Sequence, residues 1–148
     1  NLDILARQPL WEMGEDFKHG TGHGVGYLLN VHEGPNSFRW KIVPGGNAVL
    51  EEGMITSDEP GYYREDGFGI RHENLMVCKK AEKTEYGQFM CFEFLTMVPF
   101  DLDGVVPELM SVRERNLLND YHVQVYEKIS PYLNEEEKEW LKDATRAI

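Results

Sequence analysis

Cysteine is scarce in this sequence, and long hydrophobic runs are missing. Of its 148 residues only Cys78 and Cys91 are cysteines, and they lack the Cys-x-x-Cys spacing of zinc and redox motifs. We therefore expect two reduced, largely buried thiols in a cytoplasmic protein, with a disulfide across neighbouring strands as the less favoured alternative. No apolar stretch approaches the ~20 residues of a membrane-spanning helix, so no membrane partner is expected.

Clustered positive charge is also missing. Lys and Arg number 15 against 26 Asp and Glu, which gives a net charge of −11, and the basic residues are spread along the chain. This argues against nucleic acid as a partner, because nucleic-acid-binding surfaces concentrate Lys and Arg. Part of the acidity is local, and we expect it at the solvated start of a helix containing Glu135, Glu136, Glu137 and Glu139.

The N-terminal residues 1–8 carry a helical pattern. Leu2, Leu5 and Ala6 have the spacing of one helix face. Pro9 disfavours the helical conformation in the residue before it, so we expect the helix to end there. Because so short a helix is marginal alone and the chain does not begin with methionine, we interpret it as the end of a longer helix.

Strand signals fill the middle of the chain. Residues 54–59 and 69–78 predict two strands that are separated by a turn around residues 64–67. The polar residues 79–88 predict a hairpin loop. The nearly continuous apolar run 89–100 predicts a strand covered on both faces.

The C-terminal part predicts two helices. Ser111 and Asn134 each stand three residues before a glutamate, which is the capping-box spacing that opens a helix. Pro131 is expected to end the first helix, and Trp140 and Leu141 supply the apolar side of the second. Strands followed by helices indicate an α+β fold with mixed or antiparallel strands. The apolar face of the first helix is predicted to contain Leu117, Leu118, Tyr121, Val125 and Ile129.

Residues 19–35 form the most informative stretch, because three of the five histidines, His19, His23 and His32, stand there among glycines. Histidines four apart could share a helix face and bind one metal. Glycine, however, costs a helix about 1 kcal/mol at each position relative to alanine, so we predict a loop or bent strand. Glycine permits positive φ and leaves room for a substrate or ion to approach. A lone histidine is usually structural, whereas three in such a run indicate a functional site.

The same stretch carries a family resemblance. Residues 17–35 contain Phe-Lys-His-Gly-Thr-Gly-His-Gly-Val-Gly and Leu-Asn-Val-His-Glu-Gly-Pro, and they resemble the signature of aminopeptidase P, the Xaa-Pro aminopeptidase of the pita-bread metallopeptidase family. The resemblance continues through Ser-Asp-Glu-Pro-Gly-Tyr-Tyr at 57–63 and Gly-Ile-Arg-His-Glu-Asn at 69–74, and more loosely through 94–99 and the last helices. It implies that residues 1–148 are the C-terminal portion of a pita-bread catalytic domain whose upstream part is absent.

The resemblance implies that His23, Glu59 and Glu73 bind metal. In the family pattern, the histidine before Gly-Val-Gly and the glutamates of Glu-Pro-Gly and Arg-x-Glu-Asn hold two divalent ions. One imidazole among carboxylates suits manganese, with cobalt or zinc as alternatives. Two glutamates cannot balance the four positive charges of two ions, so further anionic ligands are needed, and the resemblance implies two aspartates upstream. Spacing alone favours solvent-facing charges for both glutamates, because charged residues mostly face solvent.

Four further residues receive roles from the resemblance. His19 and His32 are implied to be catalytic and to line the substrate pocket, where an imidazole can exchange a proton near neutral pH. Tyr63 and Arg71 are implied to orient the metal-binding carboxylates. An ordinary surface arginine is the alternative for Arg71.

Three remaining polar residues are interpreted as structural. Strand alternation turns His72 away from Glu73, and His122 lies in a predicted helix. Glu93 stands in the apolar run and is expected to be a hydrogen-bonded core residue.

The resemblance implies a metal-dependent aminopeptidase that releases an N-terminal residue preceding proline, by attack of a hydroxide that bridges two metal ions. Its partner would be a peptide with proline in second position. A chain that lacks half of its sheet is also expected to expose an apolar strand face, so we expect a second copy as partner in a homodimer. This chain alone, without the upstream ligands, is expected to be inactive. A related Xaa-Pro dipeptidase, a methionine aminopeptidase and a noncatalytic peptide- or protein-binding module of the same fold are the alternatives.

Overall fold

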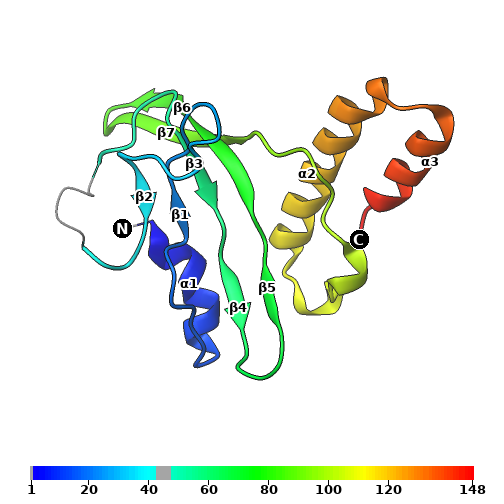
Figure 1. Ribbon diagram of the computed structural model, residues 1–148. Coiled ribbons are helices and arrows are strands. Elements are labelled where there is room, and N and C mark those ends of the chain that lie inside the picture. The colour runs from blue at the N-terminus through cyan, green and yellow to red at the C-terminus, as the bar shows by residue number, and fades with distance from the viewer. Residues whose placement is uncertain (1, 43–47) are drawn as a thin grey trace. The chain divides into compact units, whose positions relative to one another are not determined.

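The computed structural model describes residues 2–42 and 48–148, which form two compact units that meet between Thr96 and Met97 (Figure 1). Every strand pair is antiparallel and two helices follow the last strand, which confirms the α+β prediction. No helix in the described ranges is long and apolar enough to cross a membrane.

The first unit contains α1 (Asp3–Glu12), β1 (Gly22–His23), β2 (Ser37–Phe38), β3 (Ile55–Asp58), β4 (Gly61–Tyr63), β5 (Gly69–Arg71), β6 (Asn74–Thr84) and β7 (Gly87–Phe94). The second contains α2 (Val112–Ile129), α3 (Glu135–Ala144) and three short 3-10 helices, Leu102–Gly104, Pro107–Leu109 and Ser130–Tyr132.

Helix α1 continues through Pro9, so the predicted end before this proline is wrong. Proline removes the N–H that would bond to the carbonyl of Leu5. Leu5 is 67% exposed, so water can replace that bond. On the opposite side the helix is anchored by Arg7, which is fully buried and pairs with Asp3 at 2.6 Å.

Strand β6 is the centre of a three-stranded sheet in the order β3-β6-β7. It pairs with β7 up to Thr84, so most of the predicted loop over residues 79–88 is strand, and only a tight turn joins the two (Figure 1). The prediction failed because polar side chains do not exclude a strand when both of its faces meet solvent.

Strand β7 is exposed rather than covered on both faces. Phe89 is 52% exposed and Leu95, just beyond the strand, is 45% exposed. Glu93 is also exposed, so its interpretation as a core residue is wrong. Both cysteines are free, as expected, but only Cys78 is buried, whereas Cys91 lies exposed on β7. Within the described residues, β7 is an edge strand whose apolar side chains remain uncovered.

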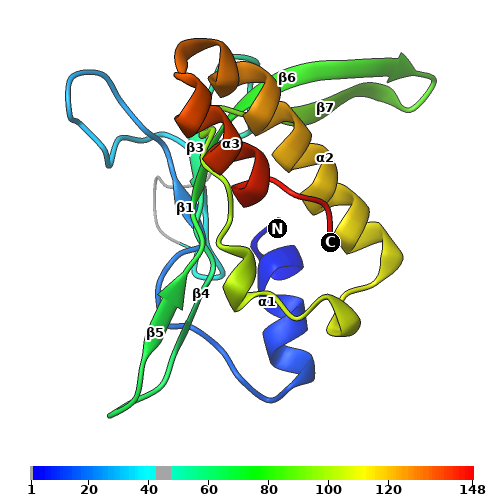
Figure 2. The same cartoon turned by 90° about the vertical axis from the view of Figure 1, so that its right-hand side faces the viewer.

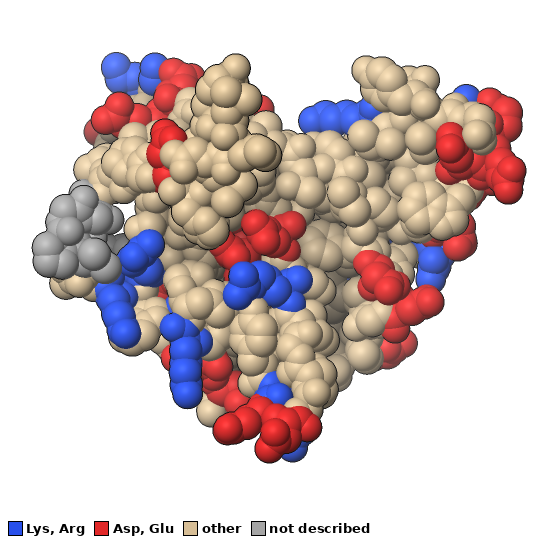
Figure 3. Space-filling model, viewed as in Figure 1, with Lys and Arg blue, Asp and Glu red and all other residues tan. Residues whose placement is uncertain are grey.

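Both predicted capping boxes are present in the second unit. The Ser111 hydroxyl accepts the Glu114 N–H while the Glu114 carboxylate accepts the Ser111 N–H, and Asn134 and Glu137 repeat this arrangement. Helix α2 ends at Ile129, as the later proline predicted. The acidic start of α3 is exposed to solvent, and Figure 3 shows acidic side chains gathered over this helix.

Tyr121, Val125 and Leu141 form the core between α2 and α3, which lie side by side in both views (Figures 1 and 2). Leu117 and Trp140, which are predicted to lie on the apolar sides of these helices, are 59% and 64% exposed.

His122 is structural, as predicted. Its side chain is fully buried beside this core, and its Nε2 accepts the N–H of Phe100 at 3.0 Å. Burial disfavours the charged imidazolium and lowers the pKa of His122 below the ordinary value of 6.5.

This burial predicts a loss of stability in acid. Below pH 6.5 and down to the lowered pKa, the unfolded state binds more protons at His122 than the folded state does, so stability falls as pH falls. One such group contributes at most about 1.4 kcal/mol per pH unit. His122→Gln keeps an acceptor for Phe100 and should flatten this dependence in urea unfolding between about pH 7.5 and about pH 5. Equal acid sensitivity of both proteins would contradict it.

Candidate metal centre

The histidine stretch is a loop with one very short strand, β1, as predicted. Its glycines do not have positive φ, however, so that part of the prediction is wrong. Close approach explains them instead. A Cβ on Gly22 would lie 1.9 Å from the carbonyl oxygen of Ser57, so only glycine lets β1 come this near to β3.

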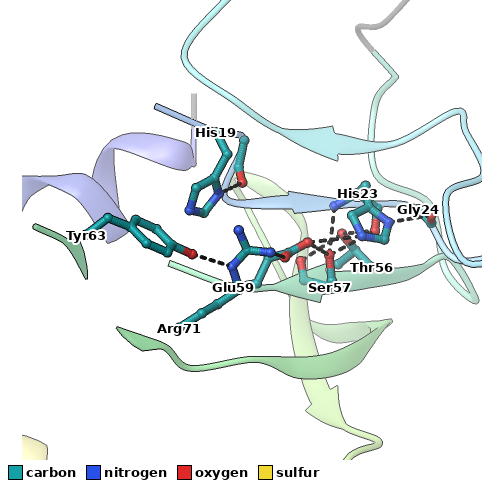
Figure 4. Close-up of polar contacts among 9 residues, drawn as sticks. His19, His23, Gly24, Thr56, Ser57, Glu59, Tyr63 and Arg71 are labelled. Atoms are coloured by element: carbon teal, nitrogen blue, oxygen red, sulfur yellow. Dashed lines mark hydrogen bonds and ion pairs between the residues drawn. The ribbon is translucent and has the colours of Figure 1, made fainter. Parts of the chain in front are cut away.

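His23 and Glu59 come together at this approach. Figure 4 shows the imidazole pointing toward the carboxylate, with 3.0 Å between Nε2 and Oε1. The Nδ1 atom lies 3.0 Å from the Gly24 carbonyl, which can only accept, so Nδ1 carries a hydrogen. Nε2 and the carboxylate therefore face each other across a position that requires a proton or a cation. An imidazole whose second nitrogen donates to a carbonyl is the usual arrangement of a metal-binding histidine.

Ser57 supports both members of this pair. Its hydroxyl donates to Glu59 Oε1 at 3.0 Å and accepts the backbone N–H of His23 at the same distance. The backbone N–H of Glu59 is bound by the Thr21 carbonyl at 2.7 Å. Glu59 is only 7% exposed, so its carboxylate is held almost entirely by protein groups. Sequence reasoning did not assign a role to Ser57, although strand alternation places it on the same face as Glu59.

Arg71 binds the other oxygen of Glu59, with 3.0 Å between Nη1 and Oε2. Its Nε donates to the Tyr63 hydroxyl at 2.7 Å. This hydrogen bond, followed by the charges of Glu59 and Glu73, raises the pKa of Arg71 above its usual value. Tyr63 and Arg71 thus form one hydrogen-bonded chain that ends on the Glu59 carboxylate (Figure 4).

His19 lies against Tyr63, with 5.4 Å between ring centroids in an edge-on arrangement. Its Nδ1 donates to the Gly20 carbonyl at 2.8 Å. Its Nε2 is buried and has no hydrogen-bond partner in the described part of the chain, so the ring presents an unused acceptor. His32 is exposed and packs against His23, with ring centroids 4.2 Å apart.

Glu73 lies just after β5 and is exposed. It does not join His23 and Glu59, since residues 2–42 and 48–148 contain no group of three His, Cys, Asp or Glu side chains that could hold a metal. The donors present fit a divalent cation in kind, as an imidazole and a buried carboxylate, but they are too few to enclose one.

Comparison with known proteins bears on this site. Residues 1–80 match the model of metallopeptidase family M24, and residues 88–148 match the C-terminal region of peptidase M24. The chain belongs to metallopeptidase family M24.

Two curated relatives illustrate the similarity. The chain is 45% identical to a probable Xaa-Pro aminopeptidase P of Arthroderma otae, over 99% of this chain and 24% of that protein. It is 43% identical to aminopeptidase P1 of Lotus japonicus, over 99% and 22%. The chain therefore spans about a quarter of the length of these curated relatives.

A solved structure resembles the chain throughout. This X-prolyl aminopeptidase from Caenorhabditis elegans is described as a cytosolic enzyme with a di-nuclear active site. It is 37% identical, with a TM-score of 0.89, and the match covers 99% of this chain and 24% of that one. This similarity confirms the prediction of a pita-bread fold.

Proposed function

We propose that this chain is the C-terminal portion of the catalytic domain of a metal-dependent aminopeptidase, which releases an N-terminal residue that precedes proline. We base this proposal on one observation: His23 Nε2 lies 3.0 Å from Glu59 Oε1 in a chain of family M24. The names of the relatives support the substrate class.

His23, Glu59 and Glu73 would hold two divalent ions, manganese first, together with carboxylates from outside this chain. The two glutamates supply two negative charges against four positive ones, so the missing charge must come from further residues of the full-length protein. When bound, such ions polarise the scissile carbonyl and supply a nucleophile at neutral pH.

The remaining residues position the peptide and the carboxylate. Arg71 and Tyr63 fix the orientation of Glu59, and its burial keeps water from competing for the carboxylate. His19, which lies against Tyr63, and the exposed His32, which packs against His23, would line the peptide pocket, where an imidazole can donate to a developing negative charge.

Two alternatives differ in what they require. A noncatalytic binding module of this fold needs no imidazole and carboxylate facing each other, so the His23 and Glu59 pair favours the enzyme. An Xaa-Pro dipeptidase would use the same metal residues, and peptide length separates it: an aminopeptidase accepts tripeptides and longer peptides.

We also propose a homodimer in the cytoplasm. The exposed apolar side chains of β7 support association, since an uncovered strand edge readily pairs with another chain. The cytosolic M24 neighbour supports the compartment. Light scattering at high concentration measures this association. A strictly monomeric mass would contradict the proposed homodimer.

The activity is tested with the full-length protein and with residues 1–148 alone. The full-length protein should cleave Xaa-Pro tripeptides, most strongly with added manganese. This cleavage should cease when a chelator is added. The isolated 148 residues should not cleave them, because the ligands present cannot enclose a metal. Turnover by the isolated chain, or indifference of the full-length protein to chelators, would contradict the proposal.

A further inference from the structure

A buried ion pair on α1 lies beneath the histidine loop. Arg7 is fully buried and Asp3 is 3% exposed, with 2.6 Å between Arg7 Nε and Asp3 Oδ2. Neither residue carries a feature that marks it in the sequence as part of a metal site.

Three further hydrogen bonds from Arg7 go to residues 16–19, the segment that leads into the loop. Nη1 donates to the Asp16 carboxylate at 2.8 Å and to the Phe17 carbonyl at 2.5 Å. Nη2 donates to the carbonyl of His19 at 2.5 Å. The guanidinium also stacks on the Phe17 ring, 3.9 Å from its centroid. One side chain thus fixes the backbone on which His19 stands.

Asp3 extends this anchoring to Glu59. Its second oxygen, Oδ1, accepts the Thr21 hydroxyl at 2.6 Å. The carbonyl of Thr21 in turn accepts the backbone N–H of Glu59 at 2.7 Å. The ion pair is therefore linked through hydrogen bonds to both His19 and Glu59.

Stability alone does not explain such a pair. Desolvation of two buried charges roughly cancels their attraction, and apolar residues of similar volume are often as stable or more so. A guanidinium can, however, donate hydrogen bonds to several acceptors that lie in its plane, which the ammonium group of lysine cannot do.

Resting on the proposed function, we propose that Arg7 is a positioning residue of the active site. It acts through the carbonyl of His19 and, by way of Asp3 and Thr21, through the backbone of Glu59. It touches neither substrate nor metal.

Two variants of the full-length protein separate positioning from folding. Arg7→Lys keeps a charge for Asp3 but cannot hold both carbonyls. The double variant Asp3→Asn with Arg7→Met removes both charges and keeps an acceptor for Thr21, but it leaves the Phe17 and His19 carbonyls without a donor, so thermal stability is measured beside kcat. In both, kcat should fall about 10- to 100-fold while KM for the peptide and the manganese content stay near those of the wild type. The exposed Arg113→Lys is the control and should change nothing.

A second measurement does not depend on activity. Ring ¹⁵N NMR of the histidines should show altered His19 signals in both variants, with His122 unchanged as the internal reference. Unchanged kcat with unchanged His19 signals would overturn the proposal. So would a loss of kcat that merely follows the loss of folded protein or bound manganese. If the wild type does not cleave Xaa-Pro peptides, the proposed function fails, and the His19 signals alone decide whether Arg7 positions this ring.

Discussion

Glu59→Gln is expected to lower the turnover of Xaa-Pro peptides in the full-length protein by more than about 100-fold. This exceeds the loss expected for a residue that only supports a metal ligand. The amide keeps the volume and can keep one bond from Ser57 or Arg71, so folding should survive. It removes the negative charge that faces His23 at 3.0 Å and is the buried half of the ligand pair. Manganese content by mass spectrometry should fall together with kcat/KM.

The control for this variant is Glu127→Gln, an exposed glutamate on α2 that should leave both rate and metal unchanged. Normal manganese content and normal turnover in Glu59→Gln would show that this carboxylate is not a ligand. Loss of turnover with full metal occupancy would assign Glu59 to the reaction rather than to metal binding.

Gly22→Ala should damage both the fold and the site. The added methyl would stand 1.9 Å from the Ser57 carbonyl oxygen and 2.9 Å from the Phe38 ring. Strand β1 must then move away from β3, which breaks the bond from the His23 N–H to Ser57 and separates His23 from Glu59. Overpacking against backbone leaves little room to relax, so we expect a loss of about 3 kcal/mol in unfolding free energy.

Thermal unfolding followed by circular dichroism measures this loss of stability. The rate of peptide cleavage should also fall, because His23 and Glu59 are then separated. The control is Gly104→Ala, where an added Cβ meets no atom within 4 Å and φ is not positive. A Gly22→Ala protein with wild-type stability and activity would mean that β1 does not need this approach.

Local features of the fold could be predicted from the sequence, while tertiary ones could not. The capping boxes at Ser111 and Asn134 involve residues three apart, so their chemistry is visible in the chain itself. The helix through Pro9 and the length of β6 depend on tertiary contacts. Burial of Arg7 overrides the local helix propensity at Pro9, and pairing with β7 overrides the loop propensity of the polar residues in β6.

The site divides in the same way. His19, His23, Glu59, Tyr63 and Arg71 stand in motifs, and the fold brings them together from β1, β4, β5 and the segments beside them. The roles of Ser57 and Arg7 come from contacts across 34 and 12 residues, which no spacing rule reveals. Glu73 stays a prediction, because its partners as a ligand would include residues outside this chain.

In the proposed enzyme, His23, Glu59 and Glu73 contribute to a two-metal site. Anomalous diffraction at the manganese edge, on crystals of the full-length protein prepared with manganese, tests it most directly. We expect two peaks, with His23 Nε2 and the two glutamate carboxylates within about 2 to 2.5 Å of them. Peaks located away from His23 and Glu59, or an active manganese-dependent enzyme with no peak at His23, would contradict it.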